Sequence, residues 1–242
     1  DKKFWHFFDN KTEFNQLFKD QVKREWLNFS TATEEQFAEF LKGRGDIICK
    51  PIDGSSGQGI FKCTPDEYGD VHALYEKLKA AGIGIVEDQV IQHEVISALC
   101  PTSVNTIRVA TLLGDKKEGI VYAYIRIGNG KVMDNVDCGG MAAPINLETG
   151  VISGVGANKS GEVYEIHPMT GKRIPGTQIP YWNEVKAMCL KAMHVVPQVR
   201  FVAWDVAITP TGPVFIEGNS FPSHAIPQFA AHFPDGIGIL PR

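Results

Sequence analysis

The chain has 242 residues and a formal net charge of −4, which is enough sequence for a substantial core in one domain or in two joined lobes. The charge balance and the absence of basic runs argue against nucleic acid as the main partner, and no apolar run has the length of a membrane span or the form of a signal peptide. The five cysteines are odd in number and form no C-x-x-C pair, so they indicate small buried side chains rather than a disulfide framework or a zinc site. We therefore expect a cytoplasmic protein, and because the chain begins at Asp1 without a methionine, we expect that a segment precedes it.

Predicted helices and strands alternate in blocks along the chain. Thr33 and Gln36 form a capping box at the start of one helix, and Gly82 is typical of a residue that ends another. In chain order the predictions are helices at 12–20 and 33–42, a hairpin at 46–63, a helix at 65–81, a buried strand at 83–86 that continues into 87–90, strands at 105–113 and 119–127, turn-rich hairpins at 144–180, a helix at 183–194, and strands at 201–208 and 214–217. This order predicts an α+β fold with two lobes.

The segment KPIDGSSGQGIFKC, residues 50–63, places a lysine and a proline before three closely spaced glycines. It is not a Walker phosphate loop, which closes with Gly-Lys-Ser/Thr, and it lacks the third glycine and the helix start of a dinucleotide-binding turn. We predict a hairpin whose bare backbone N–H groups face an anion, together with the hydroxyls of Ser55 and Ser56 and the charge of Lys50. The alternative is a solvent loop with an incidental lysine, and this segment alone does not decide between the two.

The last predicted hairpin, in FVAWDVAITPTGPVFIEGNS, carries two carboxylates and an amide. If Thr209 faces Pro213 across the turn, counting back along the strands pairs Asp205 with Glu217, and the period of two places Asn219 on the same face. Such hard oxygen ligands suit a Mg²⁺ ion that also holds nucleotide phosphates. A slip of one residue would move Asp205 to the other face. The alternative, a pair of solvated edge carboxylates, is less favoured because the flanking residues are apolar.

Several motifs in this order resemble the ATP-grasp superfamily, and some resemble its branch associated with sugar transfer in bacterial polysaccharide loci. They are Lys50-Pro51 before the glycine hairpin, Val86-Glu87-Asp88, the sequence SVNTIR at 103–108, the sequence HPMTG at 167–171, Asp205, and the sequence IEGN at 216–219. The resemblance implies an ATP-grasp fold, with two α+β lobes that hold the nucleotide between them. The N-terminal lobe with the lid hairpin would comprise residues 1–90, and the C-terminal lobe with the metal site residues 91–242.

The resemblance also implies a set of nucleotide-binding residues. Lys50 would hold the α and β phosphates under the glycine lid, residues 87–90 would form the hinge that reads adenine, and Asn105 or Thr106 would lie near the ribose. Lys11 resembles an earlier nucleotide lysine, although a surface helix lysine is an equal alternative. The full set is Lys11, Lys50, Gly54, Ser55, Ser56, Gly57, Gly59, Glu87, Asp88, Val90, Asn105 and Thr106.

The resemblance assigns Asp205, Glu217 and Asn219 to Mg²⁺, and Arg108 and Arg126 to the transferred phosphoryl group. The alternative for the two arginines is an ordinary place on a strand, but the apolar neighbours of Arg126 favour a purposeful charge.

The acceptor pocket is expected near Asn135 and the Gly139-Gly140 turn, and in the long 145–180 segment. Within that segment, an aromatic face, a titratable ring and a fixed cation would suit a sugar or an anionic acceptor; they belong to Tyr164, His167 and Arg173. The alternative is a plain surface hairpin.

The sequence also departs from the generic ligases in ways that leave the substrate open. Ala203-Trp204 stands where many ligases carry an arginine before the metal aspartate, and Phe221-Pro222-Ser223 replaces the usual proline-glycine turn. We also expect the customary N-terminal domain not to be part of this sequence. Three functions follow from the resemblance: a ligase that uses ATP and Mg²⁺ to join a carboxylate to an amine, a phosphotransferase on the same scaffold, or a nucleotide-binding module without turnover.

Overall fold

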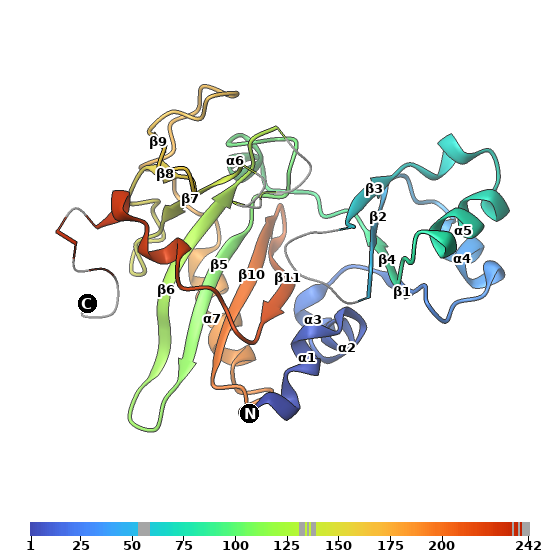
Figure 1. The fold of residues 1–242 in the computed structure, drawn as a ribbon, viewed down its shortest axis with the longest axis horizontal. Helices are drawn as coiled ribbons and strands as arrows, with labels where there is room; N and C mark the ends of the chain where they lie inside the picture. Colours follow the sequence, from blue (N-terminus) through green and yellow to red (C-terminus); the bar gives the residue numbers. More distant parts are fainter. Residues whose placement is uncertain are drawn as a thin grey trace.

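The computed structural model describes residues 1–52, 59–130, 134, 136, 139–233, 235, 236 and 238, and it confirms the α+β class (Figure 1). Two antiparallel sheets have the strand orders β1-β4-β2-β3 and β11-β10-β5-β6-β7-β8-β9. The strands are β1 (Trp26–Asn28), β2 (Ile47–Lys50), β3 (Phe61–Cys63), β4 (Ile85–Asp88), β5 (Ile107–Leu113), β6 (Glu118–Ile127), β7 (Met141–Pro144), β8 (Gly156–Ala157), β9 (Val163–Tyr164), β10 (Phe201–Thr209) and β11 (Gly212–Asn219). The α-helices are α1 (His6–Asp9), α2 (Lys11–Leu17), α3 (Lys19–Val22), α4 (Glu34–Leu41), α5 (Val71–Ala80), α6 (Glu94–Ser97) and α7 (Trp182–Ala192).

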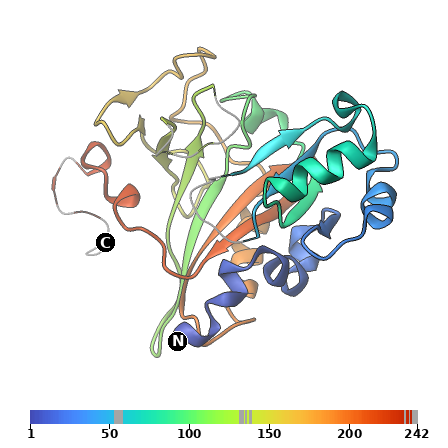
Figure 2. The same cartoon turned by 45° about the vertical axis from the view of Figure 1, so that its right-hand side comes forward.

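The four-stranded sheet carries α4 and α5 on one side (Figures 1 and 2). Thr33 and Gln36 form the predicted capping box at the start of α4. The helix expected at 65–81 is instead a short 3₁₀ turn followed by α5, because Gly69 has a φ of 79° and Asp70 caps the new helix through its side chain. The predicted hairpin is confirmed as the antiparallel pair β2 and β3.

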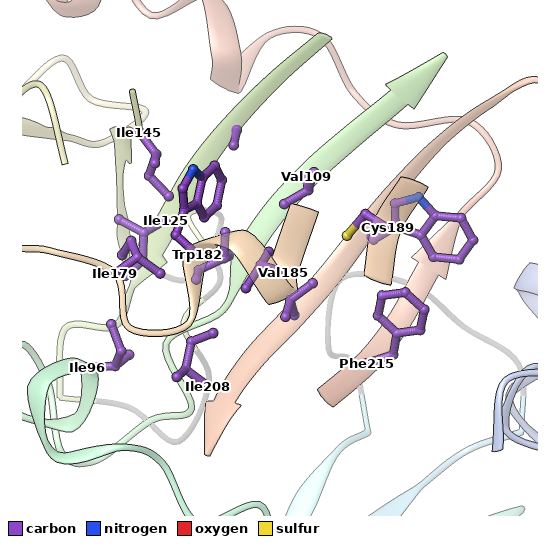
Figure 3. Packing of buried hydrophobic residues seen from close by; sticks show 14 of the residues in the cluster. Ile96, Val109, Ile125, Ile145, Ile179, Trp182, Val185, Cys189, Ile208 and Phe215 are labelled. Carbon is purple, nitrogen blue, oxygen red and sulfur yellow. The ribbon is translucent and has the colours of Figure 1, made fainter. Parts of the chain in front are cut away.

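The seven-stranded sheet packs one face against α7. Trp182 and Val185 of this helix lie over the strand residues Val109, Ile125 and Ile208 in a single apolar cluster (Figure 3). Side chains alternate along a strand, so the neighbours of these residues point to the opposite face of the sheet. That opposite face is where the polar residues described below gather.

The first three helices pack against the same large sheet, beside β11 (Figure 1). Phe18 is 1% exposed, and its ring centroid lies 4.8 Å from that of Phe14, 5.3 Å from that of Trp204 and 5.9 Å from that of Phe215. The chain therefore contributes to the core of the large sheet before it builds the small one. A division of the chain at residue 90 stays a prediction.

The sequence patterns did not indicate α1, β1 or α6, each of which has only three or four residues. Strands and helices of that length contain too few residues to show a period, and β1 forms by pairing with β4.

In the described part of the chain, no helix is long and apolar enough to cross a membrane. The prediction of small buried cysteine side chains is confirmed for Cys49, Cys63, Cys100 and Cys189; Cys138 lies outside the described residues.

Replacing Phe18 by alanine is expected to lower the free energy of unfolding by about 3–5 kcal/mol, because it leaves a cavity among four aromatic rings. Denaturant unfolding of the variant measures this loss. The neighbouring exposed residue offers a control, since Lys19→Ala should change the value by no more than about 0.5 kcal/mol. A loss below about 1 kcal/mol for Phe18→Ala would mean that the first helices are not part of this core.

Candidate active site

The hairpin of β10 and β11 brings the predicted carboxylates together. Asp205 lies opposite Glu217, as expected, but the path to this pairing differs from the predicted one. Thr209 pairs with Gly212, one residue earlier than the sequence count assumed, and a β-bulge then leaves Ile216 as an extra residue. The two differences cancel. Because a bulge re-aims side chains, Ile216 and Glu217 both line the same cavity although they are neighbours.

Asp205 is fully buried and is held by two arginines from adjacent strands. Arg108 donates from Nε and Nη2 to its two oxygens, at 2.7 and 2.6 Å, and Arg126 donates from Nη2 at 2.8 Å. Burial alone would raise the pKa of Asp205, but the two guanidinium groups outweigh it and hold this pKa well below its usual range. The strands predicted at 105–113 and 119–127, which carry the two arginines, are confirmed as β5 and β6, and these two strands pair with each other. The two arginines contact Asp205 from other strands, while the residues directly before Asp205 in the sequence are Ala203-Trp204.

Glu217 and Asn219 extend this cluster toward solvent. Glu217 has a side chain that is 38% exposed, and its carboxyl group lies close enough to that of Asp205 to share a hydrogen bond. Partial burial and the nearby Asp205 carboxylate both raise the pKa of Glu217. Asn219 continues the strand as predicted and donates its amide to the carbonyl oxygen of Ala203, 3.3 Å away.

These three residues fit a magnesium ion by their chemistry. Two carboxyl groups in contact repel each other once both are ionised, and a cation placed between them removes that repulsion. Mg²⁺ usually keeps several waters and takes one or two carboxylates, so it needs no larger cage of protein ligands. Among the described residues, no group of three His, Cys, Asp or Glu side chains that could hold a metal occurs.

Across from this cluster, Lys50 and Glu87 form a buried ion pair on neighbouring strands of the small sheet. Glu87 also accepts from Arg24, whose Nη2 lies 3.0 Å from Oε2. Burial opposes ionisation, but the two cations outweigh it and lower the pKa of Glu87 to about 2. The carboxylate at the end of β4 is therefore ionised at neutral pH.

A cavity of about 730 Å³ lies between the two sheets and collects most of the predicted site. From the small sheet it is lined by Lys50 and by the predicted hinge, Glu87 to Val90. The large sheet contributes Arg108, Arg126, Glu217 and Asn219. The structure thus brings the lysine, the hinge, the arginines and two of the three proposed metal ligands to one cleft, with Asp205 buried beneath it.

The remaining predicted nucleotide residues are distributed unevenly. Thr106 lines the cleft, whereas Asn105 is fully buried and uses its amide on the carbonyl oxygens of Ile96 and Cys100. Lys11 lines a second cavity of about 450 Å³, which shares Lys50 with the first. Four of the predicted lid residues lie outside the described residues: Gly54, Ser55, Ser56 and Gly57. The fifth, Gly59, lies two residues before β3 and has a φ of 72°.

The predicted acceptor residues do not converge on the cleft. His167 has no exposed surface, and Nε2 lies 2.9 Å from the carbonyl oxygen of Gly128, which corrects the expectation of an accessible ring. Arg173 is exposed on its hairpin and pairs with Glu165 at 3.2 Å. Tyr164 packs against the apolar cluster of the large sheet. The aromatic face, ring and cation were expected to act together, and the fold directs them to different surroundings.

The glycine turn before β7 has a backbone explanation. Gly139 has a φ of 94°, which side chains other than glycine rarely adopt, and a Cβ added there would meet nothing within 4 Å. Gly140 follows it directly, and Asn135 lies outside the described residues. Acceptor recognition at these three positions stays a prediction.

Sequence reasoning missed several residues of the site, among them Arg24, Asp134 and Ile48. Arg24 lies between a helix and a three-residue strand, where no motif marks it. Asp134 accepts from the backbone and hydroxyl of Thr106, at 2.8 and 2.5 Å, and lies 3.4 Å from Arg126 Nε. Ile48 lines the cleft opposite the bulged strand. The alternation of β2, which puts residues 48 and 50 on one face, could have found Ile48; nothing in the pattern marks the other two.

The two sheets and the cleft between them define the ATP-grasp fold, which solved structures share. One is the ATP-grasp ligase PsnB with a phosphomimetic variant of its minimal precursor, Mg and ADP, at a TM-score of 0.51 and 16% identity over 93% of this chain and 53% of that chain. Another is the biotin carboxylase domain of Hydrogenobacter thermophilus 2-oxoglutarate carboxylase with MgADP, ADP and bicarbonate, at a TM-score of 0.56 and 14% identity over 93% of this chain and 42% of that chain. A third is the D-alanine-D-alanine ligase from Coxiella burnetii, at a TM-score of 0.53 and 12% identity over 95% of this chain and 54% of that chain. The chain thus spans about half the length of these proteins.

The chain belongs to the sugar-transfer associated ATP-grasp family, whose model matches residues 1–233. No curated protein matches it in sequence. The resemblance drawn from the ordered motifs is therefore confirmed at the level of the family and of the fold.

The stability of the protein should depend on pH through Glu87. Its pKa is about 2 in the folded chain against an ordinary value of 4.5, so the unfolded chain takes up a proton first as the pH falls. The contribution of this group, about 3 kcal/mol, is complete above the ordinary pKa and is lost as the pH falls toward 2. Denaturant unfolding between pH 6 and pH 3 should therefore show a shallower decline for Glu87→Gln than for the wild type.

An exposed ion pair of the same lobe supplies the control for this measurement. Glu39 pairs with Lys42, and both side chains are 71% exposed, so Glu39→Gln should follow the wild-type pH dependence. If the free energy of unfolding of Glu87→Gln and of the wild type depended on pH in the same way, the neighbours of Glu87 would not lower its pKa in the folded protein.

Proposed function

We propose that the protein is an ATP- and Mg²⁺-dependent ligase that activates a carboxylate as an acyl phosphate for attack by an amine. The observation that carries the proposal is the position of Asp205 with its two arginines, directly across the cleft from Lys50 and the hinge. Solved neighbours of the same fold are complexed with MgADP or with Mg and ADP, which supports the choice of nucleotide and ion. The family description refers to sugar transfer, which supports a small-molecule or sugar-linked acceptor. We propose that the protein acts in the cytoplasm, in bacterial polysaccharide or cell-surface sugar metabolism.

Each group in the cleft has a task in this proposal. Lys50 binds the α and β phosphates, and the backbone of residues 87–90 pairs with the adenine edge. Asp205, Glu217 and Asn219 would hold Mg²⁺, which supplies charge neutralisation for the β and γ phosphates when it is bound. Arg108 and Arg126 orient the γ-phosphoryl group and stabilise the charge that spreads over its oxygens during transfer.

The chemistry then proceeds in two displacements. A carboxylate oxygen of the substrate attacks the γ phosphorus, the bond to the bridging oxygen breaks, and ADP leaves. The amine nitrogen attacks the carbonyl carbon of the acyl phosphate, phosphate leaves, and the nitrogen loses a proton. No protein nucleophile takes part, so the residues act by positioning and by charge.

The decisive experiment is a screen of acids, amines and sugars scored by ADP formation, with product masses from mass spectrometry. ADP and phosphate release that needs both an acid and an amine, together with a condensed product, supports the ligase. A stable phosphorylated sugar instead identifies a phosphotransferase on the same scaffold. Nucleotide binding without ADP formation for any pair would favour the non-catalytic module.

The proposed metal site predicts that Glu217→Gln lowers kcat by at least roughly 100-fold while ATP affinity changes little, because metal charge stabilisation is worth several kcal/mol in the transition state. Single-turnover ADP formation measures the first effect, and calorimetry measures the second. Glu165→Gln, which removes an exposed carboxylate from the 145–180 segment, should keep wild-type turnover. Normal Mg²⁺-dependent ADP formation by Glu217→Gln would remove this residue from the metal site.

A further inference from the structure

Arg24 joins the two sheets at the side of the cleft. It follows α3 directly after Lys23, whose left-handed backbone, with a φ of 55°, turns the chain out of the helix. Its Nη1 donates to the carbonyl oxygen of Phe215 at 2.5 Å, and its Nη2 donates to that of Ile216 at 3.3 Å. The same Nη2 lies 3.0 Å from Glu87 Oε2. One guanidinium group therefore holds the edge strand β11 of the large sheet and the end of β4 in the small sheet.

Glu87 is shared between this arginine and Lys50. The three side chains of Arg24, Glu87 and Lys50 are only 6%, 4% and 9% exposed. These three side chains carry a net charge of +1 between them. Lys50 and Glu87 line both cavities, together with Glu217, so an anion in either cavity can approach Lys50.

The ion pair of Lys50 and Glu87 conflicts with the proposed task of the lysine. A lysine that binds phosphate has to give up part of its contact with Glu87. If Lys50 were the only partner, its departure would leave a buried carboxylate without a counter-charge, and the carboxylate would compete with ATP for the lysine. Arg24 removes this competition because it stays on Glu87 through the second carboxylate oxygen.

We propose that Arg24 is a positioning residue that keeps Glu87 neutralised, so that Lys50 can pass from this carboxylate to a nucleotide phosphate. The inference rests on the proposed function, since it takes Lys50 as an ATP ligand. The competing explanation is that Arg24 only ties the sheets together through the β11 carbonyl groups. The two explanations differ in the effect of removing the Glu87 charge after Arg24 has been lost.

Calorimetric titration with ATP of the full chain and three variants tests this difference. Arg24→Met should bind ATP at least about tenfold more weakly than the wild type, because Glu87 then holds Lys50. Adding Glu87→Gln to Arg24→Met should release the lysine and restore affinity to within about threefold of the Glu87→Gln single variant. A double variant that binds as weakly as Arg24→Met, or more weakly, overturns the proposal in favour of the structural tie.

Two further arginine variants guard against a trivial loss of fold. Arg24→Lys keeps a charge beside Glu87 but cannot reach both β11 carbonyl groups, so we expect ATP affinity within about threefold of the wild type. A tenfold loss in a folded Arg24→Lys variant, judged by circular dichroism, overturns the proposal even if Arg24→Met does not fold. Arg200→Met removes an arginine that, like Arg24, donates to a backbone carbonyl oxygen and to a carboxylate, those of Leu113 at 2.7 Å and Asp115 at 2.8 Å. Arg200 lines neither cavity, so this matched control should bind ATP as the wild type does.

The Lys50→Ala variant distinguishes a failure of the proposed function from a failure of the proposed role of Arg24. If the wild type does not bind ATP, or if Lys50→Ala binds it normally, the proposed function itself fails. If Lys50→Ala loses affinity while Arg24→Met keeps it, only the role of Arg24 is overturned.

Discussion

A carboxylate without water around it has to be paired with a cation, and two such carboxylates determine the arrangement of this cleft. Asp205 in the large sheet is held by Arg108 and Arg126, and Glu87 in the small sheet is held by Lys50 and Arg24. Removing one partner from a buried pair costs about 3–5 kcal/mol, so the strands that carry these charges have to keep their register. The two clusters face each other across one cavity, which places cations where nucleotide phosphates would lie.

The antiparallel hairpins were the most predictable part of the structure. Apolar runs on both sides of a turn with proline and glycine sufficed to place Asp205 opposite Glu217 by counting back from the turn, although two errors of one residue cancelled in that count. A bulge has no signature in a sequence of this kind, because its extra residue is accommodated by the neighbouring strand rather than by a local preference. The short β1 and the position of the first helices on the large sheet depend on contacts between distant residues, which periodicity does not report.

The residues of the site show the same difference between what local sequence patterns predict and what contacts between distant residues decide. Residues that belong to ordered motifs, such as Lys50 and Glu217, reach the cleft as predicted, whereas Arg24 and Asp134 were missed because their partners lie far away in sequence. The expectation for His167 shows the opposite error. A titratable ring in a turn-rich segment looked accessible, but the ring packs inside and bonds a backbone oxygen. Burial of a loop residue is decided by the whole fold, so residue type alone could not indicate it.

The central claim is that the cleft binds MgATP with a change of partner at Lys50, and a crystal structure of the protein with MgADP tests it most directly. The account predicts a metal ion held by Asp205, Glu217 and Asn219, Lys50 Nζ within hydrogen-bond distance of a phosphate oxygen, and Glu87 still paired with Arg24. A nucleotide bound elsewhere, or phosphates in the cleft that leave Lys50 on Glu87 without contacting it, would contradict the account.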